Sequence, residues 1–78
     1  MNRQDISEKV IKMISDISDA DEITEDSELM DDLDVASMDV LAMCGTLEEM
    51  FGISIPEKLM RRMNTVGDII DVVSEQIN

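Results

Sequence analysis

Apolar side chains recur at helical spacing in three stretches of this sequence, and this periodicity constrains the fold more than any other feature. Steps of three and four residues place side chains on one face of a helix. The first stretch contains Ile6, Val10, Met13, Ile14 and Ile17, and the last contains Val66, Ile69, Ile70, Val73 and Ile77. This spacing predicts amphipathic helices at about residues 3–18 and 66–76.

The middle stretch predicts a second long helix at about residues 38–51. Its apolar residues are Met38, Val40, Leu41, Met43, Cys44, Leu47, Met50 and Phe51. Because this stripe is wide, we expect a central and well-buried helix. Gly45 lies in the helix interior, where glycine costs about 1 kcal/mol relative to alanine. Its presence there predicts close packing against another helix.

Local signals mark the ends of the helices. Gly52 follows the second helix and is typical of a C-terminal stop. Pro56 has a fixed φ and lacks an N–H group, which suits the first position of a short helix at about residues 56–62. Thr65, with Asp68 three residues later, resembles a capping box and predicts the start of the last helix.

A long polar segment separates the first two helices. Residues 18–28 show no helical period, and a loop of this length in a small domain usually has a function. The apolar residues expected to anchor the loop to the core are Ile23, Leu29, Met30 and Leu33. A chain of 78 residues is short enough for one domain, residues 1–78. We therefore predict an all-α four-helix bundle with three main helices, one short helix, and a long loop between helices one and two.

The distribution of charge restricts the partners of the chain. The formal net charge is −13, and the six basic residues all lie near the two ends of the sequence. All but five of the 19 acidic residues lie between Lys12 and Lys58, an interval without any basic residue. This middle region repels nucleic acids and anionic membrane surfaces. It attracts and steers basic protein partners.

Composition indicates the kind of core and the cellular compartment of the chain. Phe51 is the one aromatic residue, so the core is predicted to be aliphatic, with eight methionines available to fill it. Cys44 is the one cysteine, which precludes an internal disulfide and suits the reducing cytoplasm. The sequence shows neither a signal peptide nor an apolar run of about 18 residues that would span a membrane. We expect a cytoplasmic monomer.

Residues that commonly carry catalysis are scarce. The chain has no histidine, which excludes histidine-based triads, cysteine–histidine pairs and histidine-ligated metals. Cys44 lies on the apolar stripe of the second helix, so we favour an inert buried thiol over a nucleophile. A serine–lysine pair is left open by the sequence, although the lysines lie near the chain ends. We predict that the chain is not an enzyme.

The acidic loop raises the question of calcium binding. An EF-hand loop needs acids at alternate positions, a glycine at position six and a glutamate at position twelve. Read from Asp16 or from Asp19, neither position holds the required residue. We therefore predict no dedicated metal site and favour a solvated acidic surface. Weak cation binding by Asp31, Asp32 and Asp34 is left open.

Ser37 stands at the start of the second helix, directly after the acidic loop. Serine is a favoured N-cap residue, worth about 1 kcal/mol over alanine, and this is the structural interpretation. The functional interpretation is a modification site, because a helix N-terminus favours negative charge and its first N–H groups bind phosphate. The position of Ser37 by itself favours the N-cap interpretation over the modification site.

Several short motifs hold a fixed order and spacing around Ser37. They are Asp32-Leu33, Leu47-Glu48-Glu49-Met50-Phe51, Ile53-Ser54-Ile55-Pro56 and Thr65-Val66. Together with the first amphipathic helix and the long loop, this set resembles the acyl carrier protein family over nearly the whole chain. The resemblance implies a four-helix bundle whose serine receives 4′-phosphopantetheine from coenzyme A through a phosphopantetheinyl transferase. The terminal thiol of this arm then carries acyl groups as thioesters.

The resemblance also implies roles for individual residues. Ser37 is the attachment point, while partner enzymes of fatty-acid or related acyl biosynthesis perform the chemistry. The family's acidic second helix docks on basic patches of those enzymes. The residues expected to dock are Asp34, Met38, Asp39, Glu48 and Glu49, of which Met38 matches an exposed apolar residue just after the serine.

This chain departs from the family pattern just before the serine. Ala36 stands where an aspartate usually helps the transferase and its metal, and Asp34 stands in place of a glycine. These departures indicate a specialised carrier, such as one of a polyketide or nonribosomal-type pathway. The alternatives from other classes are an unmodified docking or regulatory module with a carrier-like fold, and a divalent-cation sensor.

Overall fold

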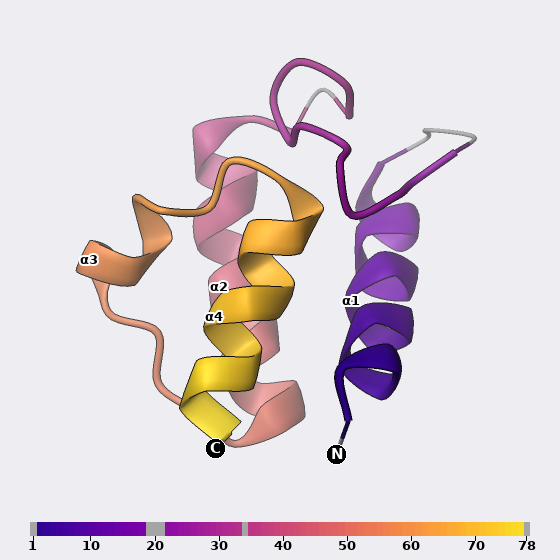
Figure 1. Cartoon of the computed structure of the whole chain (residues 1–78). Helices are drawn as coiled ribbons and strands as arrows, with labels where there is room; N and C mark the ends of the chain where they lie inside the picture. Colours follow the sequence, from indigo (N-terminus) through magenta and orange to yellow (C-terminus); the bar gives the residue numbers. More distant parts are fainter. Residues whose placement is uncertain (1, 19–21, 34, 78) are drawn as a thin grey trace.

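The computed structural model describes residues 2–18, 22–33 and 35–77. Its helices are α1 (Arg3–Ile17), α2 (Ser37–Phe51), α3 (Glu57–Met60) and α4 (Val66–Ile77). The predicted all-α bundle of three main helices and one short helix is confirmed (Figure 1). The short helix α3 is smaller than predicted, and Pro56 is its N-cap rather than its first residue.

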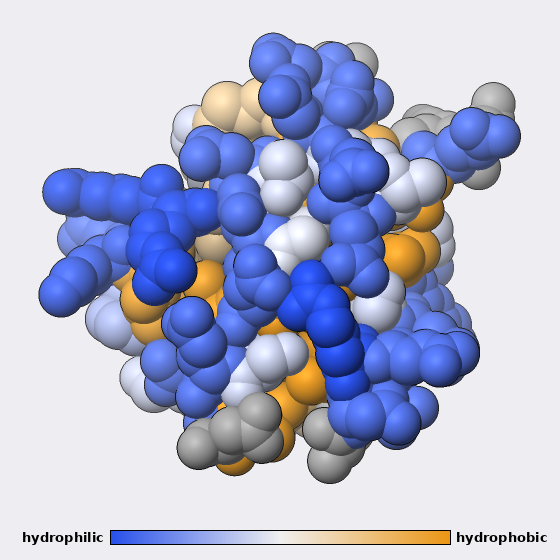
Figure 2. Space-filling model, viewed as in Figure 1, coloured by the Kyte–Doolittle hydropathy of each residue, from blue (hydrophilic) through white to orange (hydrophobic). Residues whose placement is uncertain are grey.

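The three long helices enclose an aliphatic core. α1 and α4 lie side by side, α2 packs across from α4, and α3 lies on the side away from α1 (Figure 1). The largest fully buried side chains are Ile6, Val10, Ile14, Leu29, Met43, Leu47, Val66, Ile69, Ile70, Val72 and Val73. Apart from Val72, they all belong to the helical stripes and loop anchors predicted from the sequence. Hydrophilic side chains cover most of the outer face drawn in Figure 2, with smaller apolar areas between them.

The prediction of a widely buried α2 is wrong. Its buried residues are Met43, Cys44 and Leu47, whereas Met38, Leu41 and Met50 are exposed. The physical reason is that α2 packs mainly against α3 and α4, and the part of its apolar stripe that these helices do not cover is exposed. Ile17, predicted on the inner face of α1, is also exposed because it lies at the last residue of that helix.

Of the two predictions made for glycines in the α2 region, the one for Gly45 is wrong and the one for Gly52 is confirmed. Gly45 is exposed, and a Cβ atom built on it would meet nothing within 4 Å, so the predicted close helix contact is wrong. Gly52 adopts φ 62° and ψ 41°, the left-handed conformation that glycine reaches at low cost. Its N–H donates to the Glu48 carbonyl, and it ends α2 as predicted.

The long loop is held against the start of α4 by main-chain hydrogen bonds. The Leu29 N–H donates to the Asn64 carbonyl at 2.9 Å, and the Val66 N–H donates to the Ser27 carbonyl at 3.1 Å. Ser27 is buried, and its hydroxyl oxygen accepts from the Thr24 N–H at 3.0 Å. These contacts fix the path of the loop toward Ser37.

Three of the four predicted loop anchors face the core. Leu29 and Leu33 are buried and Ile23 is half-buried. Met30 is 55% exposed, so its prediction as an anchor is wrong. The neighbouring Leu29 takes the inward position, and Val35, which was not a predicted anchor, is buried beside it. The Val35 N–H donates to the Leu29 carbonyl at 2.8 Å, which closes this part of the loop on itself.

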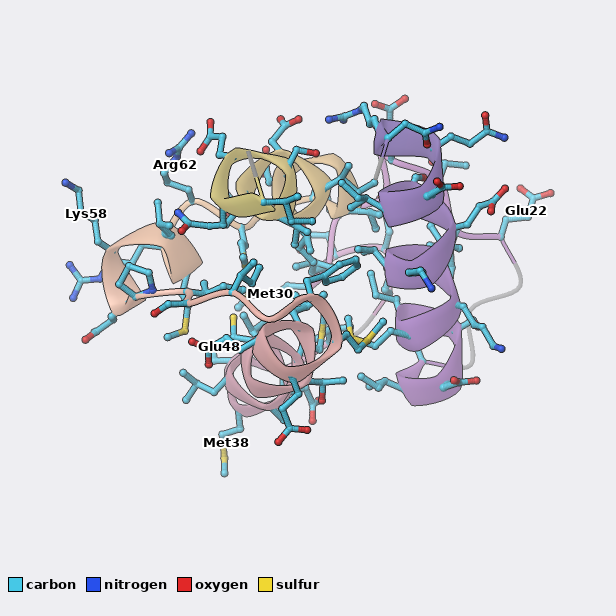
Figure 3. All side chains as sticks on the ribbon, turned by 90° about the horizontal axis from the view of Figure 1, so that it is seen from below. Glu22, Met30, Met38, Glu48, Lys58 and Arg62 are labelled. Atoms are coloured by element: carbon cyan, nitrogen blue, oxygen red, sulfur yellow. The ribbon has the colours of Figure 1, made fainter. Side chains whose placement is uncertain are left out.

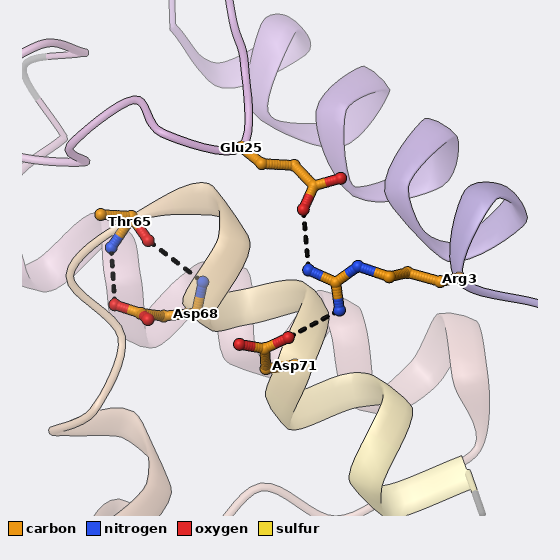
Figure 4. Close-up of polar contacts among 5 residues, drawn as sticks. All are labelled: Arg3, Glu25, Thr65, Asp68 and Asp71. Atoms are coloured by element: carbon orange, nitrogen blue, oxygen red, sulfur yellow. Dashed lines mark hydrogen bonds and ion pairs between the residues drawn. The ribbon is translucent and has the colours of Figure 1, made fainter.

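Arg3 connects three parts of the chain through one guanidinium group (Figure 4). Its Nη1 atom donates to Asp71 of α4 at 2.6 Å, and its Nη2 atom donates to Glu25 of the loop at 2.7 Å. These bonds, first with Glu25 and then with Asp71, raise the pKa of Arg3 above its usual value. The group thus ties α1, the loop and α4 together at the surface.

The predicted capping box of α4 is confirmed (Figure 4). The Asp68 N–H donates to the Thr65 hydroxyl oxygen at 3.1 Å, and Asp68 Oδ2 accepts from the Thr65 and Asn64 N–H groups at 3.0 and 2.9 Å. The aspartate therefore satisfies two donors at the end of the bundle where the loop is attached.

Replacing Asp68 by alanine is expected to lower the free energy of unfolding by about 1 to 2 kcal/mol, because two main-chain donors lose their acceptor. Urea unfolding of the variant measures this loss. Asp68→Asn keeps an oxygen acceptor and should lose less than half as much. Equal losses in the two variants would mean that the carboxylate charge, and not the cap geometry, stabilises the helix.

Candidate functional site

Ser37 is the first residue of α2, and the N-cap position belongs to Ala36, with φ −75° and ψ 162°. The interpretation of Ser37 as the N-cap is therefore wrong. Its side chain is exposed, and its hydroxyl makes no hydrogen bond with any described residue. This exposed hydroxyl stands at the positive end of a four-turn helix, where a phosphate is favoured.

Asp39 organises the start of α2 without covering it. Its Oδ2 atom accepts from the Ala36 N–H at 3.2 Å, which is one half of a capping box. Ala36 has no side-chain acceptor for the other half, so the first-turn N–H groups of α2 have no side-chain cap among the described residues. These donors remain available to an anionic group attached to Ser37.

A hollow of about 340 Å³ lies next to Ser37, between α2 and the segment that contains α3. Its apolar wall consists of Met30, Val40, Leu41, Met60 and Met63. Glu57, Arg61 and Asn64 add polar side chains to the same hollow. The attached arm of a carrier is long and partly apolar, and a hydroxyl bordering an apolar hollow fits such a group.

Exposed apolar side chains surround Ser37. Met38 is 81% exposed and points away from the bundle (Figure 3), and Leu41 is 59% exposed. Leu41 was not among the predicted site residues, although a sequence signal exists: it lies four residues after Ser37 and therefore on the same face of α2. Apolar surface of this kind beside a reactive position is typical of a docking surface.

The other residues expected to dock have three different outcomes. Glu49 is exposed on α2, and its role in docking stays a prediction. Glu48 is half-buried, and its Oε2 atom accepts from the Ile55 N–H at 2.8 Å, so it holds the link that follows α2. Asp34 lies outside the described residues.

Carboxylates crowd together in the loop that precedes the site. A hydrogen bond with Asp31, followed by the negative charge of Asp31, raises the pKa of the exposed Glu28 carboxyl. Because this pKa is higher in the folded state, its contribution to stability is present at low pH and is lost as the pH rises through it. The raised pKa reflects the crowding of negative charge in this part of the loop.

Cys44 does not belong to the site. It is buried, and its Sγ atom lies 3.8 Å from the Met63 Sδ atom, to which the thiol donates a weak hydrogen bond. Burial, with a smaller effect from the charge of Glu48, raises the pKa of the thiol. The prediction of a buried thiol is confirmed.

We expect the Cys44 thiol to react roughly tenfold or more slowly with dithionitrobenzoate in the native protein than in urea, because burial and a raised pKa suppress the thiolate. Absorbance at constant pH follows the reaction. An unmodified native protein that reacts as fast as the denatured one would contradict this assignment. An attached arm adds an exposed thiol, which should appear as a separate fast phase.

The described residues contain neither a metal cluster nor a helix that could span a membrane. Within residues 2–18, 22–33 and 35–77, no three histidine, cysteine, aspartate or glutamate side chains are grouped closely enough to hold a metal ion. No described helix combines the length and apolarity needed to cross a membrane.

Comparison with known proteins agrees with this geometry. The model of the family described as "Phosphopantetheine attachment site" matches residues 8–73. Among solved structures, the acyl carrier protein from Enterococcus faecalis is 32% identical, with a TM-score of 0.82. The match covers 97% of this chain and 99% of that chain.

Fold and site together define a small helical carrier domain. The chain belongs to the phosphopantetheine-attachment family of carrier proteins. It is an acyl carrier protein by fold and family, and not a catalyst. The group that this family carries is covalently attached 4′-phosphopantetheine, and its transfer requires a phosphopantetheinyl transferase.

Proposed function

We propose that Ser37 is the residue that carries 4′-phosphopantetheine, and that the chain delivers acyl thioesters on this arm to enzymes of fatty-acid or related acyl biosynthesis. The serine oxygen forms a phosphodiester with the arm, and the distal thiol carries the acyl group. Residues 1–78 act as a single carrier domain, as a monomer in the cytoplasm. The single buried cysteine supports a reducing compartment.

Three features of its position support Ser37 above the other serines. Its exposed hydroxyl is the first side chain of α2, the helix start there has no side-chain cap, and an apolar hollow borders it. A phosphodiester at this point gains the favourable potential of the helix N-terminus and the first-turn donors. The hydroxyl can be modified without breaking any hydrogen bond with a described residue.

The proposed partners dock through the surface around Ser37. Met38 and Leu41 supply exposed apolar contacts, while Asp39 and Glu49 supply exposed negative charge on the same helix. A basic patch beside the active site of the partner would complement these carboxylates and accelerate encounter. Glu48 and Asp34 complete the docking set expected from the resemblance, with Glu48 also holding Ile55.

Incubation of the unmodified protein with coenzyme A, Mg²⁺ and a broad-specificity phosphopantetheinyl transferase tests the proposal. Intact mass spectrometry should show the addition of one phosphopantetheine group, and peptide mapping should place it on Ser37. A carrier known to accept the enzyme serves as the positive control. A modified control with an unmodified chain, or modification at another serine, would overturn the proposal.

Ala36 favours a second candidate, an unmodified docking module with the same fold, because the residue before the serine lacks the family's aspartate. Ala36→Asp separates the two. If the natural chain is a carrier for a dedicated transferase, this variant should be modified faster by the broad-specificity enzyme and the natural chain slowly. Protein from its own cell that never carries the arm would favour the unmodified module.

A further inference from the structure

The segment around α3 has a charge opposite to the rest of the middle of the chain. Within six residues it contains Lys58, Arg61 and Arg62 against a single acid, Glu57. The preceding interval back to Lys12 contains no basic residue at all. Strongly hydrophilic side chains project on this side of the molecule in Figure 2. The surface near Ser37 therefore has two signs of charge, negative on α2 and positive beside α3.

Arg61 brings this positive charge to the site. It lines the same hollow as Ser37 and Leu41. Its guanidinium lies 3.2 Å from Glu57 Oε1, but the two side chains are 79% and 76% exposed. An ion pair that is so exposed contributes little energy. The guanidinium can therefore exchange Glu57 for an acid of a docked protein at small cost.

The two neighbouring bases are placed differently. Lys58 extends outward from the far side of α3, and Arg62 lies toward α4 (Figure 3). The Arg62 Nη1 atom is 3.8 Å from Glu75 of α4, and Arg62 does not line the hollow beside Ser37. Arg61 is thus the basic side chain that borders the attachment residue, and Arg62 provides a neighbour of the same type that does not.

We propose that Arg61 is a specificity-determining residue of the docking surface. The enzymes that fit this surface present an acidic side chain opposite Arg61 in addition to a basic patch opposite Asp39 and Glu49. This inference rests on the proposed attachment of the arm to Ser37. It adds that the complementary surface has both signs of charge rather than one.

The physical basis is discrimination by repulsion. A partner whose docking surface is uniformly basic is attracted by the carboxylates of α2 but repelled by Arg61 when it reaches Ser37. Specific interfaces commonly combine attraction of the correct partner with an unfavourable charge against the others. Because these charges are exposed, they act mainly on encounter and are sensitive to salt.

The test compares Arg61→Glu with Arg62→Glu, two variants with the same change in net charge at adjacent positions. The probe is a broad-specificity transferase with a uniformly basic docking surface, assayed by transfer from coenzyme A at low salt. We expect Arg61→Glu to raise kcat/KM roughly three- to tenfold, mainly through a lower KM. Arg62→Glu should change it less than about twofold, and about 0.5 M NaCl should abolish the gain.

A charge exchange on the transferase completes the test. When its basic residue nearest to α3 is changed to glutamate, the natural chain should become the better substrate and Arg61→Glu the poorer one. Equal effects of the two arginine variants, or no reversal with the exchanged transferase, would overturn the role of Arg61. Failure of every variant to be modified, with an active control carrier, would instead overturn the proposed attachment at Ser37.

Discussion

Leu47→Ala is expected to lower the free energy of unfolding by about 2 to 5 kcal/mol, the usual cost of an internal leucine-to-alanine change. Leu47 has 0% exposure and lies among the side chains that α2 contributes to the core. The substitution removes buried apolar surface and leaves a cavity in a core without tryptophan or tyrosine to fill it. The total free energy of unfolding of a native protein is only about 5 to 15 kcal/mol, so this loss is large.

Thermal unfolding measures this change, and the melting temperature should fall by on the order of 10 °C or more. Leu41→Ala is the matched control, because it deletes the same atoms from the same helix at a position that is 59% exposed. Its change in unfolding free energy should stay within about 0.5 kcal/mol. Similar losses for the two variants would contradict the arrangement of α2 described here.

Ser37→Ala is expected to abolish the addition of phosphopantetheine while leaving the fold intact. Alanine removes the oxygen that accepts the arm, so the loss should be complete rather than partial. The hydroxyl makes no hydrogen bond with a described residue, and alanine is a better helix former than serine. The melting temperature should therefore remain the same or rise slightly.

The transfer reaction followed by intact mass spectrometry measures the loss. Ser54→Ala is the control, because Ser54 is also exposed but lies in the link after α2. It should be modified at the natural rate. A modified Ser37→Ala protein would place the arm elsewhere, and a collapse of its melting temperature would show a structural role for the hydroxyl.

Much of the fold could be predicted from the sequence because local signals and hydrophobic periodicity agree with one another. The stripes of α1 and α4, the left-handed Gly52 and the Thr65–Asp68 cap appear as predicted. These features depend on residues close in sequence. The apolar character of Leu29 and Leu33 at the end of a polar segment also identified them as buried anchors of the loop.

The predictions that were wrong depend on which parts of the chain pack against a residue in three dimensions. An apolar stripe shows which face of α2 prefers to be covered, but it does not show that α3 is short and leaves Met38 and Leu41 exposed. The same limit explains Gly45, which faces open space rather than a neighbouring helix. Exposed apolar residues such as Met38 and Leu41 follow the same helical period as core residues, and apolar surface of this kind is typical of an interaction site.

The position of Ser37 was predicted, but its structural role was not. Serine at the start of a helix is favoured as the N-cap. However, α2 begins at Ser37, one residue before the predicted start, so Ala36 is the N-cap. Helix ends are uncertain by one or two residues in any sequence-based assignment. Here that one residue decides whether the hydroxyl is engaged by the helix or exposed beside the hollow.

Intact mass spectrometry of the protein isolated from the cells that make it tests the account most directly. We predict a mass greater than that of the polypeptide by one phosphopantetheine group, with or without an acyl group, and fragmentation that assigns the addition to Ser37. A mass equal to the bare polypeptide, in protein that a transferase and coenzyme A also leave unchanged, would contradict it.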